Sequence, residues 1–201
     1  MFSKVKKLNL KKPVLMFTGG VDSALLAYLL LKNDIDFVAF HVEMLDKYQL
    51  THAENVIIFL EKHFNKKIKF VVSIPIYTIN HPTMTEKIWD DFILKNKFDC
   101  KFTGKTKNPP INFYANEFNR PVDRDIQSVQ IKKNKINEHE FYFITPFSNL
   151  DKKDLFKIYK EENLLDNLYP LTFSCSLVYK KEHCEICWWC KERLWGFEKI
   201  G

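Results

Sequence analysis

The feature that most constrains the fold of this chain is a tight turn between two apolar segments. Residues 13–17 (Pro-Val-Leu-Met-Phe) predict a buried strand, and the almost uniformly apolar residues 24–31 predict an enclosed helix. The chain has only five glycines, and two of them, Gly19 and Gly20, are adjacent at this turn. Because glycine has no Cβ, an anion can approach the backbone N–H groups at the start of the helix. Residues 17–23 therefore predict a phosphate-binding loop, although an ordinary strand–helix turn would have a similar pattern.

The side chains of this loop extend the same interpretation. Thr18 and Ser23 add hydroxyl donors, whereas the carboxylate of Asp22 would repel an anion unless a divalent cation lay between them. We therefore expect Mg²⁺ to bridge Asp22 to phosphate oxygens. The expected phosphate ligands are the consecutive residues Thr18, Gly19, Gly20, Val21, Asp22 and Ser23.

Composition and length bound the class of protein. The chain has 201 residues, of which 46% are hydrophobic, so it is long enough for one substantial core with a small appendage. We find neither a secretory signal pattern nor an apolar stretch long enough to span a membrane, and we expect a cytoplasmic protein without a membrane partner. The net charge of +6 is spread along the chain, which favours a solvated surface over a dedicated nucleic-acid site.

Strand-like and helix-like patterns alternate from the first strand onward. This alternation predicts βαβ units, and hence an α/β fold with an open, parallel, Rossmann-like sheet and helices on both faces. The further strands are expected at 35–42, 68–74, 98–103 and 141–145, and the helices at 51–64, 83–96 and from 151. Capping boxes, in which Ser, Thr or Asp precedes an acidic residue by three positions, mark the three helix starts at Thr51, Thr83 and Asp151.

Ligands of such sheets bind at the carboxyl ends of the strands. That edge is expected to collect the 17–23 loop, the end of the second strand with Phe40, His41 and Val42, and the pair Gly104 and Lys105. Residues 105–120 contain two prolines and four asparagines without an apolar period, which predicts a long loop or a lid over the site.

Four cysteines near the C-terminus form the second motif, Cys-x8-Cys-x2-Cys-x2-Cys. Four thiolates at this spacing can close a tetrahedral zinc site, and we expect Zn²⁺ there. An iron–sulfur cluster also accepts four cysteines, and unmetallated thiols are the remaining alternative. The expected metal ligands are Cys175, Cys184, Cys187 and Cys190.

The loop resembles that of a known superfamily. Thr-Gly-Gly-Val-Asp-Ser at 18–23 is similar to the Ser-Gly-Gly-x-Asp-Ser loop of the PP-loop ATP pyrophosphatases, which cleave ATP between the α- and β-phosphates. The resemblance implies the adenine nucleotide alpha hydrolase-like fold and ATP as cosubstrate. A Walker A loop is excluded, because Gly104-Lys105-Thr106 would need a glycine where Asp99 stands.

The C-terminal motif narrows the resemblance. Thr172-Phe-Ser-Cys175 and Cys184-x2-Cys187-x2-Cys190-x2-Arg193 resemble the signature of the 7-cyano-7-deazaguanine synthase branch, which carries a structural zinc. Residues 121–125 (Pro-Val-Asp-Arg-Asp) are similar to that branch's Pro-Asp-Cys-Arg-Asp segment, with the Asp shifted and no Cys. This chain departs from the branch in having no Arg-Asn pair after its third strand and two tryptophans at 188 and 189.

The resemblance implies an ATP-dependent C–N ligase of queuosine biosynthesis. Such an enzyme adenylates the carboxylate of a 7-deazaguanine, and ammonia then displaces AMP to give the amide and, after a second activation, the nitrile. The implied catalytic residues are Asp22, Ser23, Lys105, Lys152 and Arg124. We expect an ATP-binding domain at 1–170 and a zinc-binding tail with a helix at 171–201; a tRNA or protein substrate, a homodimer and a non-catalytic binding module stay open.

Overall fold

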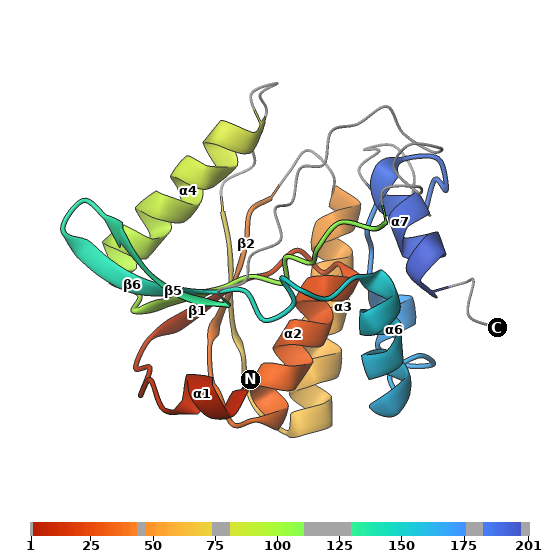
Figure 1. Ribbon diagram of the computed structural model, residues 1–201, viewed down its shortest axis with the longest axis horizontal. Helices are drawn as coiled ribbons and strands as arrows, with labels where there is room; N and C mark the ends of the chain where they lie inside the picture. Colours follow the sequence, from red (N-terminus) through yellow and green to blue (C-terminus); the bar gives the residue numbers. More distant parts are fainter. Residues whose placement is uncertain (1, 44–46, 74–80, 111–129, 176–182, 198–201) are drawn as a thin grey trace.

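A six-stranded sheet forms the centre of the molecule (Figure 1). The structure, a computed structural model, describes residues 2–43, 47–73, 81–110, 130–175 and 183–197. The strand order is β3-β2-β1-β4-β6-β5, and all neighbouring strands are parallel except the antiparallel pair β5 and β6. The strands are β1 (Pro13–Met16), β2 (Val38–His41), β3 (Lys69–Val72), β4 (Cys100–Phe102), β5 (Ile131–Ile136) and β6 (His139–Ile144).

Helices cover both faces of the sheet, as the sequence predicted. Figure 1 shows α4 on one side and α2, α3 and α6 on the other. The helices are α1 (Phe2–Lys6), α2 (Val21–Lys32), α3 (Lys47–Phe64), α4 (His81–Asn96), α6 (Lys152–Glu161) and α7 (Trp188–Phe197), with a 3₁₀ turn at Tyr169–Leu171. None of the described helices is both long and apolar enough to cross a membrane.

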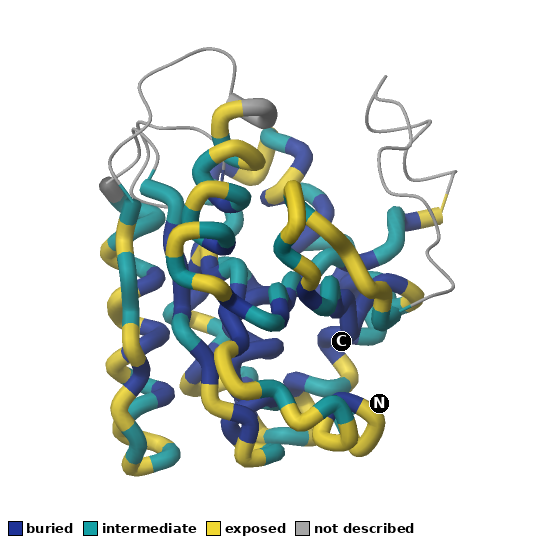
Figure 2. Tube along the Cα trace, turned by 90° about the vertical axis from the view of Figure 1, so that its left-hand side faces the viewer, coloured by how far each residue is buried: buried dark blue, intermediate teal, exposed yellow. Residues whose placement is uncertain are grey.

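The alternation of side chains along each strand builds two apolar layers. In β1, Val14 packs with Trp89 and Ile93 of α4, whereas the next residue, Leu15, packs with the helices of the opposite face. The larger layer includes most of α2, from Ala24 onward, which is why that helix is apolar all round. The buried residues gather in the middle of the molecule, whereas exposed residues lie along its outer sides (Figure 2).

The starts of two helices and one whole strand differ from the sequence-based expectation; α4, expected to begin at Thr83, begins at His81. The helix expected to begin at Thr51 begins at Lys47, because tertiary contacts extend it: Tyr48 packs against the cysteine cluster, and the Gln49 side chain donates a hydrogen bond to the Cys175 carbonyl at 3.2 Å. The edge strand β5 was not predicted. Its central residues are Lys, Lys, Asn and Lys, all exposed, so it has neither an apolar alternation nor a buried face.

Candidate functional site

The 17–23 loop connects β1 to α2 at the point where the strand order changes direction. Consecutive strands run from β1 outward to β2 and β3, and β4 then pairs on the other side of β1. Open sheets bind ligands at such a switch point, beyond the carboxyl ends of the strands. The turn with two adjacent glycines at residues 17–23 therefore lies where open sheets of this kind bind ligands.

Glycine stands at the two loop positions for different structural reasons. Gly19 has φ of +74°, and a Cβ there would lie 2.7 Å from the backbone of Ala53 in α3, so both the conformation and the space require glycine. Gly20 is the N-cap of α2 with an extended backbone, and no side chain caps this helix. Within the described part of the chain, the first N–H groups of α2 thus have no side-chain cap, at the site where an anion is expected.

Hydrogen bonds within the loop fix its shape. The Ser23 hydroxyl accepts from the Thr18 N–H at 3.2 Å, lies 3.1 Å from the Thr18 hydroxyl and donates to the Gly20 carbonyl at 3.2 Å. Ser23 is buried, whereas Thr18 is exposed. The exposed Thr18 side chain can therefore contact a ligand directly, whereas the buried Ser23 hydroxyl stabilises the shape of the loop.

Asp22 forms an ion pair with Lys152, from the opposite end of the chain. The Lys152 ammonium contacts both carboxylate oxygens; the side chain of Lys152 is 6% exposed and that of Asp22 28%. Both residues were expected at the site from the sequence analysis, but their ion pair was not predicted. In this arrangement Lys152 supplies the positive charge next to Asp22.

Glycines pack against both members of this pair. A Cβ at Gly104, which follows β4, would lie 2.9 Å from Asp22, and a Cβ at Gly196 of α7 would lie 2.2 Å from the Cβ of Lys152. Four of the chain's five glycines are described, and all four are at this site. The glycines of this chain thus mark the places where separate elements approach the loop.

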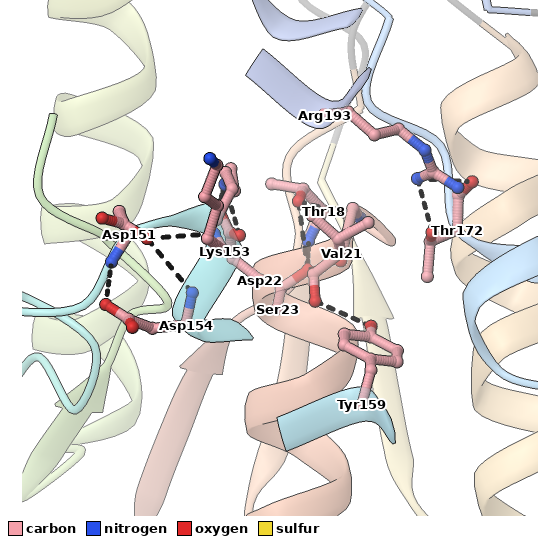
Figure 3. A network of polar contacts seen from close by, with 12 residues as sticks. Thr18, Val21, Asp22, Ser23, Asp151, Lys153, Asp154, Tyr159, Thr172 and Arg193 are labelled. Carbon is pink, nitrogen blue, oxygen red and sulfur yellow. Dashed lines mark hydrogen bonds and ion pairs between the residues drawn. The ribbon is translucent and has the colours of Figure 1, made fainter. Parts of the chain in front are cut away.

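The first turn of α6 presents Lys152. Asp151 caps the helix by accepting hydrogen bonds from the N–H groups of Lys153 and Asp154, and the Asp154 side chain accepts from the Asp151 N–H (Figure 3). This confirms the predicted capping box. The ammonium of Lys107 lies 3.4 Å from the Asp151 carboxylate, so the segment after Gly104 lies beside the start of α6.

Two further expected catalytic residues are Lys105 and Arg124. Lys105 is half-buried, directly after Gly104 at the carboxyl end of β4. Arg124 lies outside the described residues, as do positions 111–120 of the expected lid.

The end of β2 supports the loop from its other side. His41 is buried, and its Nδ1 lies 3.0 Å from the Phe17 carbonyl; because a carbonyl only accepts, Nδ1 carries the proton. Its Nε2 has no hydrogen-bond partner among the described residues. Phe40 is also buried, and Val42 is partly exposed. Of these three expected nucleotide ligands, Val42 is thus the most accessible.

The buried His41 leads to a pH prediction. Burial lowers the pKa of His41 below its ordinary value of 6.5, against the opposing effect of the Phe17 carbonyl. Below about pH 6.5 the unfolded chain binds a proton that the folded chain does not, so the free energy of unfolding falls with falling pH, by up to about 1.4 kcal/mol per pH unit.

Urea unfolding at pH 7.5 and pH 5.5 will measure this loss of stability. A His41→Asn variant should show a smaller loss, because the imidazole whose pKa burial lowers is then absent. Equal pH dependence of the two proteins would contradict the prediction.

The four cysteines of the motif come together in space. Their sulfur atoms all lie within 4.8 Å of one another, and Cys184 and Cys190 are 3.8 Å apart. A tetrahedral ion with metal–sulfur bonds of about 2.3 Å separates its sulfurs by about 3.8 Å. The Cys187 N–H also donates to the Cys184 sulfur at 3.2 Å, which favours a thiolate there. The donor set thus fits one metal ion bound by four thiolates.

Burial of the cluster affects its protonation. Cys175, Cys184 and Cys190 are buried, and burial is the main reason why the pKa of the Cys190 thiol is raised. A bound divalent cation would offset this cost by stabilising the thiolates. The fifth cysteine, Cys100, is fully buried on β4 in the main core, apart from the cluster.

Contacts between the cysteine motif and the loop were not evident from the sequence. The Phe173 N–H donates to the Gly19 carbonyl at 3.0 Å, and the buried Tyr159 hydroxyl of α6 donates to the Val21 carbonyl at 2.8 Å (Figure 3). The Arg193 guanidinium donates to the Thr172 hydroxyl at 2.7 Å. No sequence signal marks Tyr159, whereas Arg193 belongs to the C-terminal motif.

One family model matches the C-terminal part of the chain. A family model described as queuosine biosynthesis protein QueC matches residues 117–201, which contain Lys152 and all four cysteines but not the 17–23 loop. A search of the curated proteins found no significant match.

A solved structure matches the fold. It is the U34-tRNA thiolase NcsA from Methanococcus maripaludis with its [4Fe-4S] cluster, with a TM-score of 0.52 and 13% sequence identity. The match covers 76% of this chain and 57% of that one, so this chain spans little more than half the length of the thiolase. At this identity the likeness is one of fold: a mostly parallel, Rossmann-like sheet with helices on both faces.

Proposed function

We propose that this protein is a PP-loop enzyme that cleaves ATP to AMP and pyrophosphate. The observation that carries the proposal is the 17–23 loop, with the uncapped start of α2, Asp22 and Lys152 at the switch point of the sheet. Backbone N–H groups there suit phosphate oxygens, and the loop lacks the P-loop lysine that serves γ-phosphate transfer. The fold shared with the U34-tRNA thiolase supports the same reading.

We further propose that the activated group is the carboxylate of a 7-deazaguanine. The QueC model match over the C-terminal part of the chain supports this choice. The carboxylate oxygen attacks the α-phosphorus of ATP and pyrophosphate leaves; ammonia then attacks the acyl carbon, AMP leaves and the amide forms. A second activation, of the amide oxygen by another ATP, leads to the nitrile with loss of AMP.

The proposed roles follow from the positions of the side chains. The backbone of residues 18–21 holds the phosphates, with the Thr18 hydroxyl as a further donor, and Ser23 keeps the loop in shape. Lys152, released from Asp22 when the nucleotide arrives, stabilises charge at the α-phosphate, as does Lys105. Asp22 would hold Mg²⁺, and the ion would supply positive charge for the departing pyrophosphate. We assign recognition of the substrate carboxylate or base to Arg124.

For the four cysteines we propose a structural Zn²⁺. Four thiolates leave no open position for a reactive water, and the sulfur spacing suits a single ion. In a [4Fe-4S] cluster each thiolate binds a different iron atom, so its sulfurs stand farther apart than around one ion. The cluster carried by the thiolase makes iron the alternative to test.

The identity of the nucleotide products tests the proposed reaction. The protein should convert ATP labelled at the α-phosphate into labelled AMP when 7-carboxy-7-deazaguanine and ammonium are present, and mass spectrometry should find the amide or the nitrile. Labelled ADP as the primary product would contradict the proposal.

A second candidate function is adenylation of a tRNA base, which the fold of the tRNA thiolase favours. AMP formation that depends on added tRNA, and not on the deazaguanine, would select it. A non-catalytic nucleotide- and metal-binding module would bind ATP but show no exchange of pyrophosphate into ATP with any of these substrates.

A further inference from the structure

The cysteine cluster is connected to the 17–23 loop by two separate routes. The first route is the segment of residues 172–174, which directly precedes Cys175. Phe173, two residues earlier, donates its N–H to the Gly19 carbonyl at 3.0 Å, and its ring stacks on His52 of α3 with 4.7 Å between ring centroids. Phe173 is buried in the same apolar cluster as the cysteines. A displacement of Cys175 would therefore act on the backbone of Gly19.

The second route is helix α7. Cys190 lies in its first turn, and Gly196, near its end, packs directly on Lys152. Lys152 in turn forms the ion pair with Asp22. A movement of α7 would therefore act on Lys152, whose ammonium contacts Asp22.

Arg193 joins the two routes. It is buried on α7, three residues after Cys190, and donates to the Thr172 hydroxyl at 2.7 Å and to the Tyr169 carbonyl at 3.2 Å. Its guanidinium also lies 4.0 Å from the centroid of the Tyr169 ring. Because Thr172 precedes Phe173, Arg193 ties α7 to the segment that contacts Gly19.

We propose that metal binding by the four cysteines and nucleotide binding by the 17–23 loop are energetically coupled, with Gly196 and Arg193 as positioning residues between the two sites. The metal fixes the cluster ends of both routes, and their other ends are Gly19 and Asp22. By thermodynamic linkage, if the metal raises the affinity of the loop for the nucleotide, the nucleotide raises the affinity of the cluster for the metal by the same factor. This inference rests on the proposed function of the loop as a nucleotide site.

The affinity for zinc provides a test that does not depend on turnover. Protein loaded with Zn²⁺ is brought to equilibrium with a chromogenic chelator, with and without α,β-methylene-ATP and Mg²⁺, and zinc release to the chelator is measured by absorbance. Calorimetry measures binding of the analogue to the same samples. We expect the saturating analogue to raise the affinity for zinc by roughly tenfold, within the usual range of coupling between sites.

A pair of variants tests the route through α7. Gly196→Ala places a methyl group against Lys152, so we expect it to weaken analogue binding and to reduce the effect of the analogue on zinc release, while one zinc per chain is retained. Lys153→Ala is the control, because the Lys153 ammonium lies over the Trp195 ring of α7 at 5.1 Å but has no contact with the loop among those described. It should behave as the unmodified protein.

The outcomes separate this inference from the proposed function. If the analogue binds and zinc release is unchanged, the coupling is refuted and the nucleotide site stands. If the analogue does not bind at all, the proposed function fails and the inference with it. Should Gly196→Ala not fold, Arg193→Lys provides the second variant, and an undiminished effect of the analogue in that protein would count against the route.

Discussion

The rate of AMP formation is expected to fall by about 100-fold to 1000-fold in an Asp22→Asn variant. This is the usual cost of removing one group that stabilises charge in the transition state. An asparagine is a poor Mg²⁺ ligand, and it cannot balance the charge of Lys152. The measurement is the steady-state rate of AMP formation at several Mg²⁺ concentrations. A rate close to that of the unmodified protein would remove Asp22 from the mechanism.

The ion pair with Lys152 makes a stability control necessary. Lys152 is almost fully buried, so Asp22→Asn leaves its charge without a full partner and should also destabilise the fold, by up to about 3 kcal/mol. The double variant Asp22→Asn/Lys152→Met removes both charges and should recover part of this stability without recovering activity. Asp36→Asn, the same change at an exposed position before β2, should alter neither property.

Replacement of a cluster cysteine is the second change with a large expected effect. Cys187→Ser should lower metal affinity by more than the roughly 10–100-fold that loss of an outer-shell partner costs, because a direct ligand is removed. Since metal binding provides the stability of small metal-bound segments, the melting temperature should fall as well. Elemental analysis and thermal unfolding measure the two effects, and we expect one zinc per chain in the unmodified protein.

Matched substitutions make the metal prediction specific. Cys175→Ser, Cys184→Ser and Cys190→Ser should lose the metal to a similar extent, because all four thiolates close one coordination sphere. Cys100→Ser makes the same change in the main core, where it should cost stability but leave the metal content at one per chain. Iron with visible absorbance, or a Cys187→Ser protein that keeps its zinc and its melting temperature, would refute the zinc assignment.

The sequence alone was enough to predict the class of fold and the two motifs. Strands and helices alternate with the right periods, so the mostly parallel sheet followed from local patterns and the handedness of crossovers. The loop was recognisable because a chain with five glycines placed two of them side by side, and Gly19 does adopt the positive φ that only glycine adopts readily. The cysteine spacing was informative because ligand chemistry restricts which residues occur together.

Only the tertiary structure decided how these parts meet. Asp22 and Lys152 are 130 positions apart, and their pairing depends on how α6 packs beside the loop. Likewise, Phe173 reaches Gly19 through a backbone N–H, which every residue except proline has, so no side-chain pattern could mark it. The edge strand β5 was hidden for a related reason: its partner is β6, and its own exposed lysines carry no apolar period. Local patterns predict elements, whereas contacts between distant segments depend on how the whole chain packs.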